Sequence, residues 1–154
     1  MAIQLVKAVT GAKIIAMDID DQKLDVAKKN GADNTINSKK EDPVKATNKL
    51  GADAVIDSVN ASKTVETDIQ FLRSRARLVL VGLFGGDLKL SLVMMPTRAY
   101  RLIGSYTGTI SDLIELVSLA ERGVIKQAVS NRFKLDQATE ALRMLTEGKI
   151  IGRV

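Results

Sequence analysis

The 154-residue sequence contains no histidine and no cysteine. From its own side chains it therefore cannot build a Cys/His zinc site, a Ser-His-Asp triad or a Cys-His pair. A disulfide framework, which is common in small exported domains, is excluded as well. We expect a cytoplasmic protein with no catalytic residue of these types and no metal ligands of its own.

Aromatic residues are scarce, at 3% of the chain, and long apolar runs are missing. The core must therefore be aliphatic, which suits parallel sheets covered by helices. No run approaches the roughly 20 apolar residues that cross a bilayer. Lys7 and Lys13 interrupt any signal-peptide pattern near the start. We expect a soluble protein with no membrane partner.

The net charge of +5 is not concentrated anywhere along the chain. Lysine and arginine alternate with aspartate and glutamate, and no basic run is interleaved with aromatic residues. A nucleic-acid partner is therefore not expected.

A short apolar run, 14–17, ends abruptly at Asp18. Such a run is typical of a strand buried on both faces of a parallel sheet. An acidic residue at the carboxyl end of that strand can bind the ribose hydroxyls of an adenosine. It can equally cap the helix that begins near Asp21. This stretch by itself leaves both interpretations of Asp18 open.

Strands and helices alternate at roughly 20–25 residues per unit, which is typical of βαβ units and a parallel sheet. The patterns predict an α/β fold with strands over 14–18, 33–36, 54–57, 77–81 and 101–105. Helices are predicted over 2–9, 22–30, 44–50, 62–72, 110–122 and 136–147, and extended pieces over 88–92, 126–134 and 150–154.

Three predicted strand ends turn polar or glycine-rich in the same way: Asp18, then 57–60, then 82–85. In a parallel sheet these ends share one edge, where a dinucleotide binds. Gly82 and Gly85 would let a ligand approach the backbone closely. The alternative is that polar residues and glycines simply follow strands because turns need them.

One part of a dinucleotide fold is absent. The first strand and its G-x-G-x-x-G turn should stand about 20 residues before the acidic residue. Counting back from Asp18 passes Met1. We expect the sheet to lack this strand, which is the central one. The gap could close by pairing 14–18 with the strand at Val55, by a strand from another chain, or by extension of 2–9.

Several stretches, in order along the chain, resemble the coenzyme-binding part of the zinc-type, medium-chain alcohol dehydrogenases: 1–8, 31–33, 52–57, 80–85 with 87–88, 103–105 and 148–154. The resemblance implies a Rossmann-like doubly wound parallel sheet that lacks its first strand. Residues 1–123 would form a truncated NAD-binding domain. Residues 124–154, with a helix and a strand, would pack on a catalytic domain, leaving Leu142 and Leu145 uncovered without it. We expect the chain to be a C-terminal fragment of such an enzyme.

The resemblance also assigns cofactor-binding roles. Asp18 would hold the adenosine ribose and favour NAD over NADP, Ile19 would flank the adenine, and Lys23 would lie near the ribose. The other assigned residues are Val59 and Asn60 at the adenosine and adjacent ribose, Leu83 and Phe84 at the nicotinamide amide, Ser105 and Tyr106 at the same end, and Arg153 at the pyrophosphate.

The family reaction is hydride transfer between NAD and an alcohol or aldehyde, with zinc polarising the substrate oxygen. We expect this chain to orient NAD only, to be inactive alone, and to form a homo-oligomer. Alternatives are a nucleotide-binding module without chemistry, a piece that pairs with a complementary N-terminal chain, and a related quinone reductase or sugar dehydrogenase.

Overall fold

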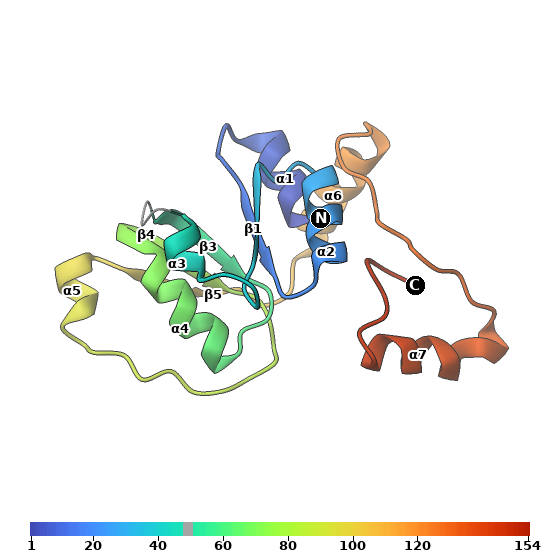
Figure 1. Ribbon diagram of the computed structural model, residues 1–154. Helices are drawn as coiled ribbons and strands as arrows, with labels where there is room; N and C mark the ends of the chain where they lie inside the picture. Colours follow the sequence, from blue (N-terminus) through green and yellow to red (C-terminus); the bar gives the residue numbers. More distant parts are fainter. Residues whose placement is uncertain (48–50) are drawn as a thin grey trace. The chain divides into compact units, whose positions relative to one another are not determined.

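The computed structural model describes residues 1–47 and 51–154, and Figure 1 labels its helices and strands. The chain divides into two compact units. One unit combines Met1–Asn37 with Thr109–Val154, and the other is Ser38–Gly108. The end of the helix predicted over 44–50 lies outside the described residues.

The first unit contains a βαβ motif. Its elements are α1 (Ala2–Val9), β1 (Ile15–Asp18), α2 (Asp21–Lys29), β2 (Asn34–Asn37), α6 (Ile110–Glu121), the 3-10 helix η1 (Leu135–Gln137) and α7 (Ala138–Thr146). β1 and β2 pair in parallel, from Ile15 opposite Asn34 to Asp18 opposite Asn37. α2 connects them and buries Leu24. The predicted strand–helix–strand order is therefore confirmed here.

The second unit is a three-stranded parallel sheet with its own core. Its elements are α3 (Pro43–Ala46), β3 (Ala52–Asp57), α4 (Ser62–Phe71), β4 (Leu72–Leu80), α5 (Met94–Arg98) and β5 (Arg101–Gly104), with strand order β3-β4-β5. α4 contacts both β3 and β4. The buried cluster consists of Val65, Ile69, Leu72, Ala76, Leu78 and Tyr100. The predicted aliphatic core is thus confirmed, with one tyrosine added.

Three predicted segments need correction. β4 begins at Leu72 rather than near residue 77, because Leu72 pairs with Ala52 ahead of an irregular stretch over 73–76. Residues 88–92 form no strand, and the helix α5 that follows was not predicted. Residues 126–134 form no strand. One isolated β-bridge, between Val129 and Arg153, is present where an extended segment was expected.

Within the described residues, no strand pairing closes the expected gap. Residues 2–9 are helical as α1, so they supply no strand. Among the described residues β1 pairs with β2 alone, and β3 pairs with β4, so no ladder joins β1 to β3. A strand donated by another chain stays a prediction.

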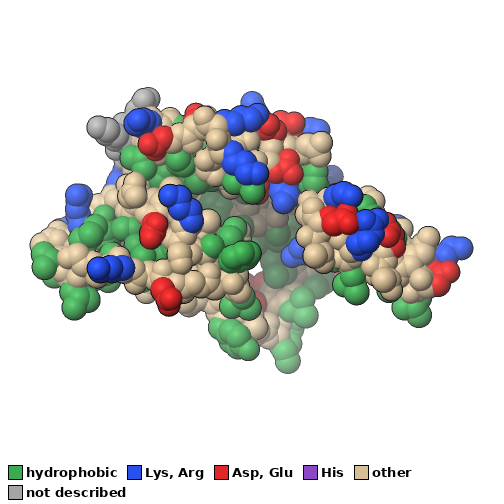
Figure 2. Space-filling view, turned by 60° about the horizontal axis from the view of Figure 1, so that its bottom comes forward, with side chains coloured by type: hydrophobic (Ala, Val, Ile, Leu, Met, Phe, Trp, Pro, Cys, Tyr) green, Lys and Arg blue, Asp and Glu red, His purple; other side chains and the backbone are tan. Residues whose placement is uncertain are grey.

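Many apolar side chains lie at the surface (Figure 2). α6 has no buried residue although Ile110, Leu113 and Val117 repeat at helical spacing. On α7, Leu142 is 64% exposed and Leu145 is 46% exposed. In the described part of the chain, no helix has the length and apolar character needed to span a bilayer.

Candidate cofactor-binding site

Asp18 closes β1 with a carboxylate that is fixed on one side only. Its Oδ1 accepts hydrogen bonds from the backbone N–H of Ile19 at 2.7 Å and of Asp20 at 3.1 Å. Within the described residues, Oδ2 accepts none, and the side chain is half-buried. The carboxylate is therefore pre-oriented, with one oxygen available to hydroxyl groups of a ligand.

The helix cap is a different residue. Asp20 is the N-cap of α2, and its Oδ1 accepts from the N–H of Gln22 at 2.9 Å. The helix-cap interpretation of Asp18 is therefore wrong, and Asp18 remains free for another role. Beside it, Ile19 is exposed and Lys23 lies half-buried in the first turn of α2.

Asp57 ends β3 in the corresponding position, but its carboxylate is fully engaged. Oδ1 accepts from the N–H groups of Val59 and Asn60, both at 2.8 Å, and Oδ2 accepts from the Thr64 hydroxyl at 2.7 Å. Asp57 is buried. Asn60 takes a left-handed conformation, with φ 58°. Asp57 thus shapes the turn after β3 rather than offering itself to a ligand.

The turn after β3 is joined to the segment after β4. The amide of Asn60 donates to the carbonyl of Gly82 at 3.0 Å, and the N–H of Phe84 donates to the carbonyl of Val59 at 3.1 Å. A Cβ at Gly82 would lie 2.3 Å from the carbonyl carbon of Val59. Gly82 is therefore required by backbone packing, whereas its predicted ligand role stays a prediction. Gly85, also bonded to this turn, has open space around it.

The predicted nicotinamide-end residues present their side chains to solvent. Leu83, Phe84 and Tyr106 are 89%, 82% and 86% exposed. Ser105 is exposed too, and its N–H donates to the carbonyl of Leu80 at 2.9 Å, which extends the β4–β5 ladder. Backbone bonds thus hold these segments while leaving apolar and hydroxyl side chains uncovered.

Arg153 lies in the first unit, on backbone that is also fixed. Its N–H donates to the carbonyl of Ala128 at 2.8 Å, and its carbonyl accepts from Ser130 N–H at 2.9 Å. The side chain is exposed. The predicted residues consequently form two groups. Asp18, Ile19, Lys23 and Arg153 belong to the first unit, and the remaining seven belong to the second unit.

A buried carboxyl pair escaped the sequence analysis. Asp68 on α4 is buried, and burial together with the charge of Asp57 raises the pKa of Asp68 to about 7. Burial also acts to raise the pKa of Asp57, but hydrogen bonds from Asn60, Thr64 and Val59 outweigh it and hold that pKa below its usual range. The available signal was the position of Asp68 on the apolar stripe of α4, three residues after Val65.

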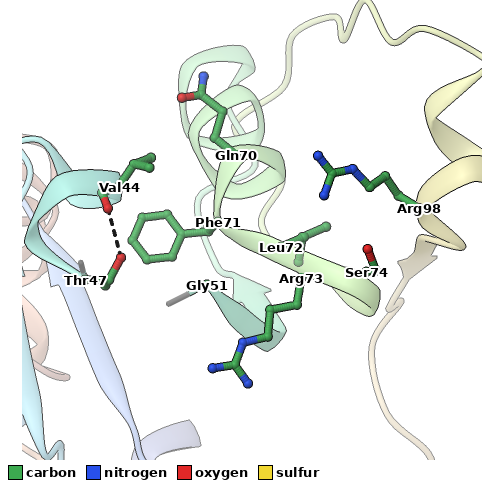
Figure 3. Close-up of a pocket in the computed structure, with 9 residues that line it drawn as sticks. All are labelled: Val44, Thr47, Gly51, Gln70, Phe71, Leu72, Arg73, Ser74 and Arg98. Carbon is green, nitrogen blue, oxygen red and sulfur yellow. Dashed lines mark hydrogen bonds between the residues drawn. The ribbon is translucent and has the colours of Figure 1, made fainter. Parts of the chain in front are cut away.

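The second unit also contains a cavity of about 440 Å³ next to α3 and α4. In Figure 3 the ring of Phe71 lies beside Val44 and Thr47, and Arg73 and Arg98 also line the space. Arg73 is paired with Asp53 at 3.1 Å. No predicted cofactor residue belongs to the described lining of this cavity, so we do not assign the cofactor to it.

The described residues contain no group of three acidic, histidine or cysteine side chains arranged to hold a metal ion.

Comparison with known proteins matches residues 1–122 to the family model described as "Zinc-binding dehydrogenase". An NAD-dependent alcohol dehydrogenase of Sulfurisphaera tokodaii is 41% identical over 99% of this chain. One from Saccharolobus solfataricus is 38% identical, also over 99%. The alcohol dehydrogenase of Aeropyrum pernix, a solved structure, has a TM-score of 0.90, with 33% identity over 98% of this chain. These matches confirm the predicted fold as a truncated Rossmann-type, doubly wound one.

The chain spans less than half of these relatives. It covers 45% of the length of each of the two curated enzymes and 44% of the Aeropyrum pernix chain.

Proposed function

This chain belongs to the zinc-binding dehydrogenase family, and we propose that it forms the NAD-binding part of an alcohol dehydrogenase. The observation that carries the proposal is the carboxylate of Asp18. Two backbone N–H groups orient it, while Oδ2 accepts no hydrogen bond within the described residues. That arrangement suits the two hydroxyl groups of a ribose, which donate hydrogen bonds.

The same carboxylate accounts for the proposed preference for NAD. In NADP a phosphate occupies the 2′ position, so it would bring a second negative charge to Asp18. Like charges in contact at a partly desolvated site cost several kcal/mol. Lys23, half-buried in the first turn of α2, would contact the ribose.

The other predicted residues would hold the rest of the cofactor. Val59 and Asn60 would contact the adenosine side, and Leu83, Phe84, Ser105 and Tyr106 would line the nicotinamide end. The exposure of Leu83, Phe84 and Tyr106 supports this assignment, because such large apolar side chains gain free energy from being covered. Arg153, with an exposed guanidinium, would pair with the pyrophosphate.

In the proposed reaction NAD accepts a hydride from an alcohol. This chain would bind and orient the cofactor, and it would contribute no zinc ligand of the Cys/His type because it has no histidine or cysteine. We propose accordingly that it has no dehydrogenase activity alone. Residues 124–154 would pack on the zinc-binding domain, and the chain would assemble as a homo-oligomer.

The experiment is a calorimetric titration of the chain with NADH and with NADPH. We expect NADH to bind more tightly than NADPH, and Asp18→Asn to weaken NADH binding by about tenfold, since a hydrogen bond to a charged group is worth about 1.5–3 kcal/mol. Asp25→Asn is the matched control, an exposed aspartate on α2. Equal affinity of the two variants for NADH would refute the role of Asp18.

A nucleotide-binding module without chemistry is the second candidate, favoured by the absence of histidine and cysteine from the sequence. It shares the NADH-binding expectation. Turnover after addition of a zinc-binding partner segment separates the two candidates.

A further inference from the structure

We propose that Asp57 is the positioning residue of the cofactor site: it binds no cofactor itself but fixes the turn after β3 and, through that turn, the segment after β4. This inference rests on the proposed function, because it concerns the backbone that would contact NAD.

Asp57 stabilises the turn that follows it through hydrogen bonds to both carboxylate oxygens. One oxygen receives the N–H groups of Val59 and Asn60, each at 2.8 Å, and the other receives the Thr64 hydroxyl at 2.7 Å. Asn60 adopts φ 58°, a left-handed conformation that few residues other than glycine and asparagine adopt. Charge-assisted hydrogen bonds to the Asp57 carboxylate stabilise it.

Hydrogen bonds join this turn to the segment after β4 and fix that segment in place. The carbonyls of Val59 and Asn60 accept from the N–H groups of Phe84 and Gly85, both at 3.1 Å. The Asn60 amide donates to the carbonyl of Gly82 at 3.0 Å. If the turn relaxed, these three bonds would be lost together. The placement of Phe84, proposed to lie near the nicotinamide, therefore depends on Asp57.

The Asp57 carboxylate is not available to bind the cofactor directly. Asp57 is only 6% exposed, and its second oxygen faces Thr64 in the first turn of α4. Its charge also acts on the buried carboxyl of Asp68, which lies on the same helix as Thr64. The carboxylate therefore points toward α4, in contrast to Asp18, which has an open oxygen. Acidic residues at two strand ends thus take different roles.

The test combines three substitutions of Asp57 with one control. Asp57→Ala removes both amide bonds. Asp57→Glu keeps the charge but displaces the carboxylate by one methylene. Asp57→Asn keeps an oxygen that can accept from both N–H groups, and its amide can donate to Thr64. Tyr100→Phe is the matched control, because it removes a buried bond of 3.3 Å to the carbonyl of Leu72 away from the turn.

NADH affinity, the thermal midpoint and the ¹⁵N chemical shifts of the Val59 and Asn60 amides are measured for each variant. We expect Asp57→Ala and Asp57→Glu to weaken NADH binding at least about tenfold, and Asp57→Asn and Tyr100→Phe by less than about threefold. The two amide resonances should move in the Ala and Glu variants and stay close to wild type in the Asn and Phe variants.

Two results would overturn the proposal. One is an affinity loss in Asp57→Ala no larger than in Tyr100→Phe at an equal thermal midpoint. The other is that the Val59 and Asn60 amide shifts stay at their wild-type values in Asp57→Ala and Asp57→Glu. If Asp57→Ala does not fold, equal affinities of the Glu and Asn variants overturn it instead. A wild-type chain that binds no NADH refutes the proposed function, and the amide shifts then still decide whether Asp57 fixes the turn.

Discussion

Asp68 is the residue at which pH should act on stability. Its folded-state pKa, about 7, lies above its ordinary value of 3.8, so between these values the folded chain binds more protons than the unfolded chain. The stability that Asp68 contributes is therefore full below about pH 4 and is lost as pH rises to about 7. Asp57, whose pKa is lowered, acts in the opposite sense and only at more acidic pH.

We therefore predict that Asp68→Asn removes most of this pH dependence. The asparagine imitates the protonated acid because it is neutral at every pH in this range. Urea unfolding at several values between pH 5 and 8 should show wild-type stability falling by a few kcal/mol and the variant nearly constant. Asp25→Asn, an exposed control on α2, should follow the wild type. Parallel curves for wild type and Asp68→Asn would contradict the prediction.

Arg75 stores backbone strain that one substitution should release. It is exposed and has φ 67°, in the irregular stretch between Leu72 and Arg77 of β4. A side chain in this conformation costs about 1 kcal/mol, of which the greater freedom of unfolded glycine cancels part. Arg75→Gly should raise the free energy of unfolding by about 0.5 kcal/mol, measured in urea. Arg75→Ala, which keeps the Cβ, should give no gain, and an equal gain would point to charge instead.

The sequence could identify these residues only in part. Asp18, Asp20 and Asp21 are all acids at one strand–helix junction, and spacing cannot say which of them caps the helix. In the structure the backbone N–H of Gln22 donates to Oδ1 of Asp20, which identifies Asp20 as the helix cap. Similarly, Asp57 was visible as a polar strand end, but nothing local shows that its carboxylate faces Thr64. That direction depends on how α4 packs.

At the scale of elements, apolar periodicity and helix-end residues predicted the bounds of long segments accurately. α6 was predicted to within one residue, because its apolar spacing is regular and Gly123 follows it. α5 was missed since its five residues offer no full period and contain Pro96. Its end is set by Ala99 at φ 53°, which no sequence rule predicts for alanine. Short elements are specified by packing more than by local pattern.

The exposed face of α7 leads to a prediction about assembly. Leu142, 64% exposed, lies on a helix that is braced by ion pairs of Arg143 with Glu140 and Glu147. Leu142→Glu should therefore keep the helix and reduce self-association of the chain, because contiguous exposed apolar surface drives association. Light scattering after size exclusion, with circular dichroism, measures both. Thr139→Glu adds the same charge at another exposed position of α7 and should leave the assembly unchanged. Identical masses for the two variants would contradict the prediction.

For the whole molecule, the alternation of strands and helices was enough to predict the α/β class and parallel pairing. The βαβ connection requires parallel strands, and both sheets have them. The strand pairing of β1 could not be predicted, because the sequence left three ways of closing the gap open, one of which required residues 2–9 to become extended. In the structure these residues form α1, whose Gln4 bonds with Asn30 and with the backbone of Lys126, contacts between segments far apart in the sequence.

The last prediction concerns catalysis by the complete assembly. Alcohol oxidation needs both a bound NAD and a group that polarises the substrate oxygen, and a sequence without histidine or cysteine offers no Cys/His zinc site for the second task. The chain alone should therefore form no NADH from NAD and ethanol, with or without added zinc. Co-expression with the zinc-binding N-terminal segment of a related alcohol dehydrogenase should restore NADH formation, which is followed by its absorbance. With that segment present, Asp18→Asn should lower the rate at limiting NAD, while Asp25→Asn should not. Zinc-dependent turnover by the chain alone would contradict the proposal that this chain only binds NAD and another segment supplies the zinc site.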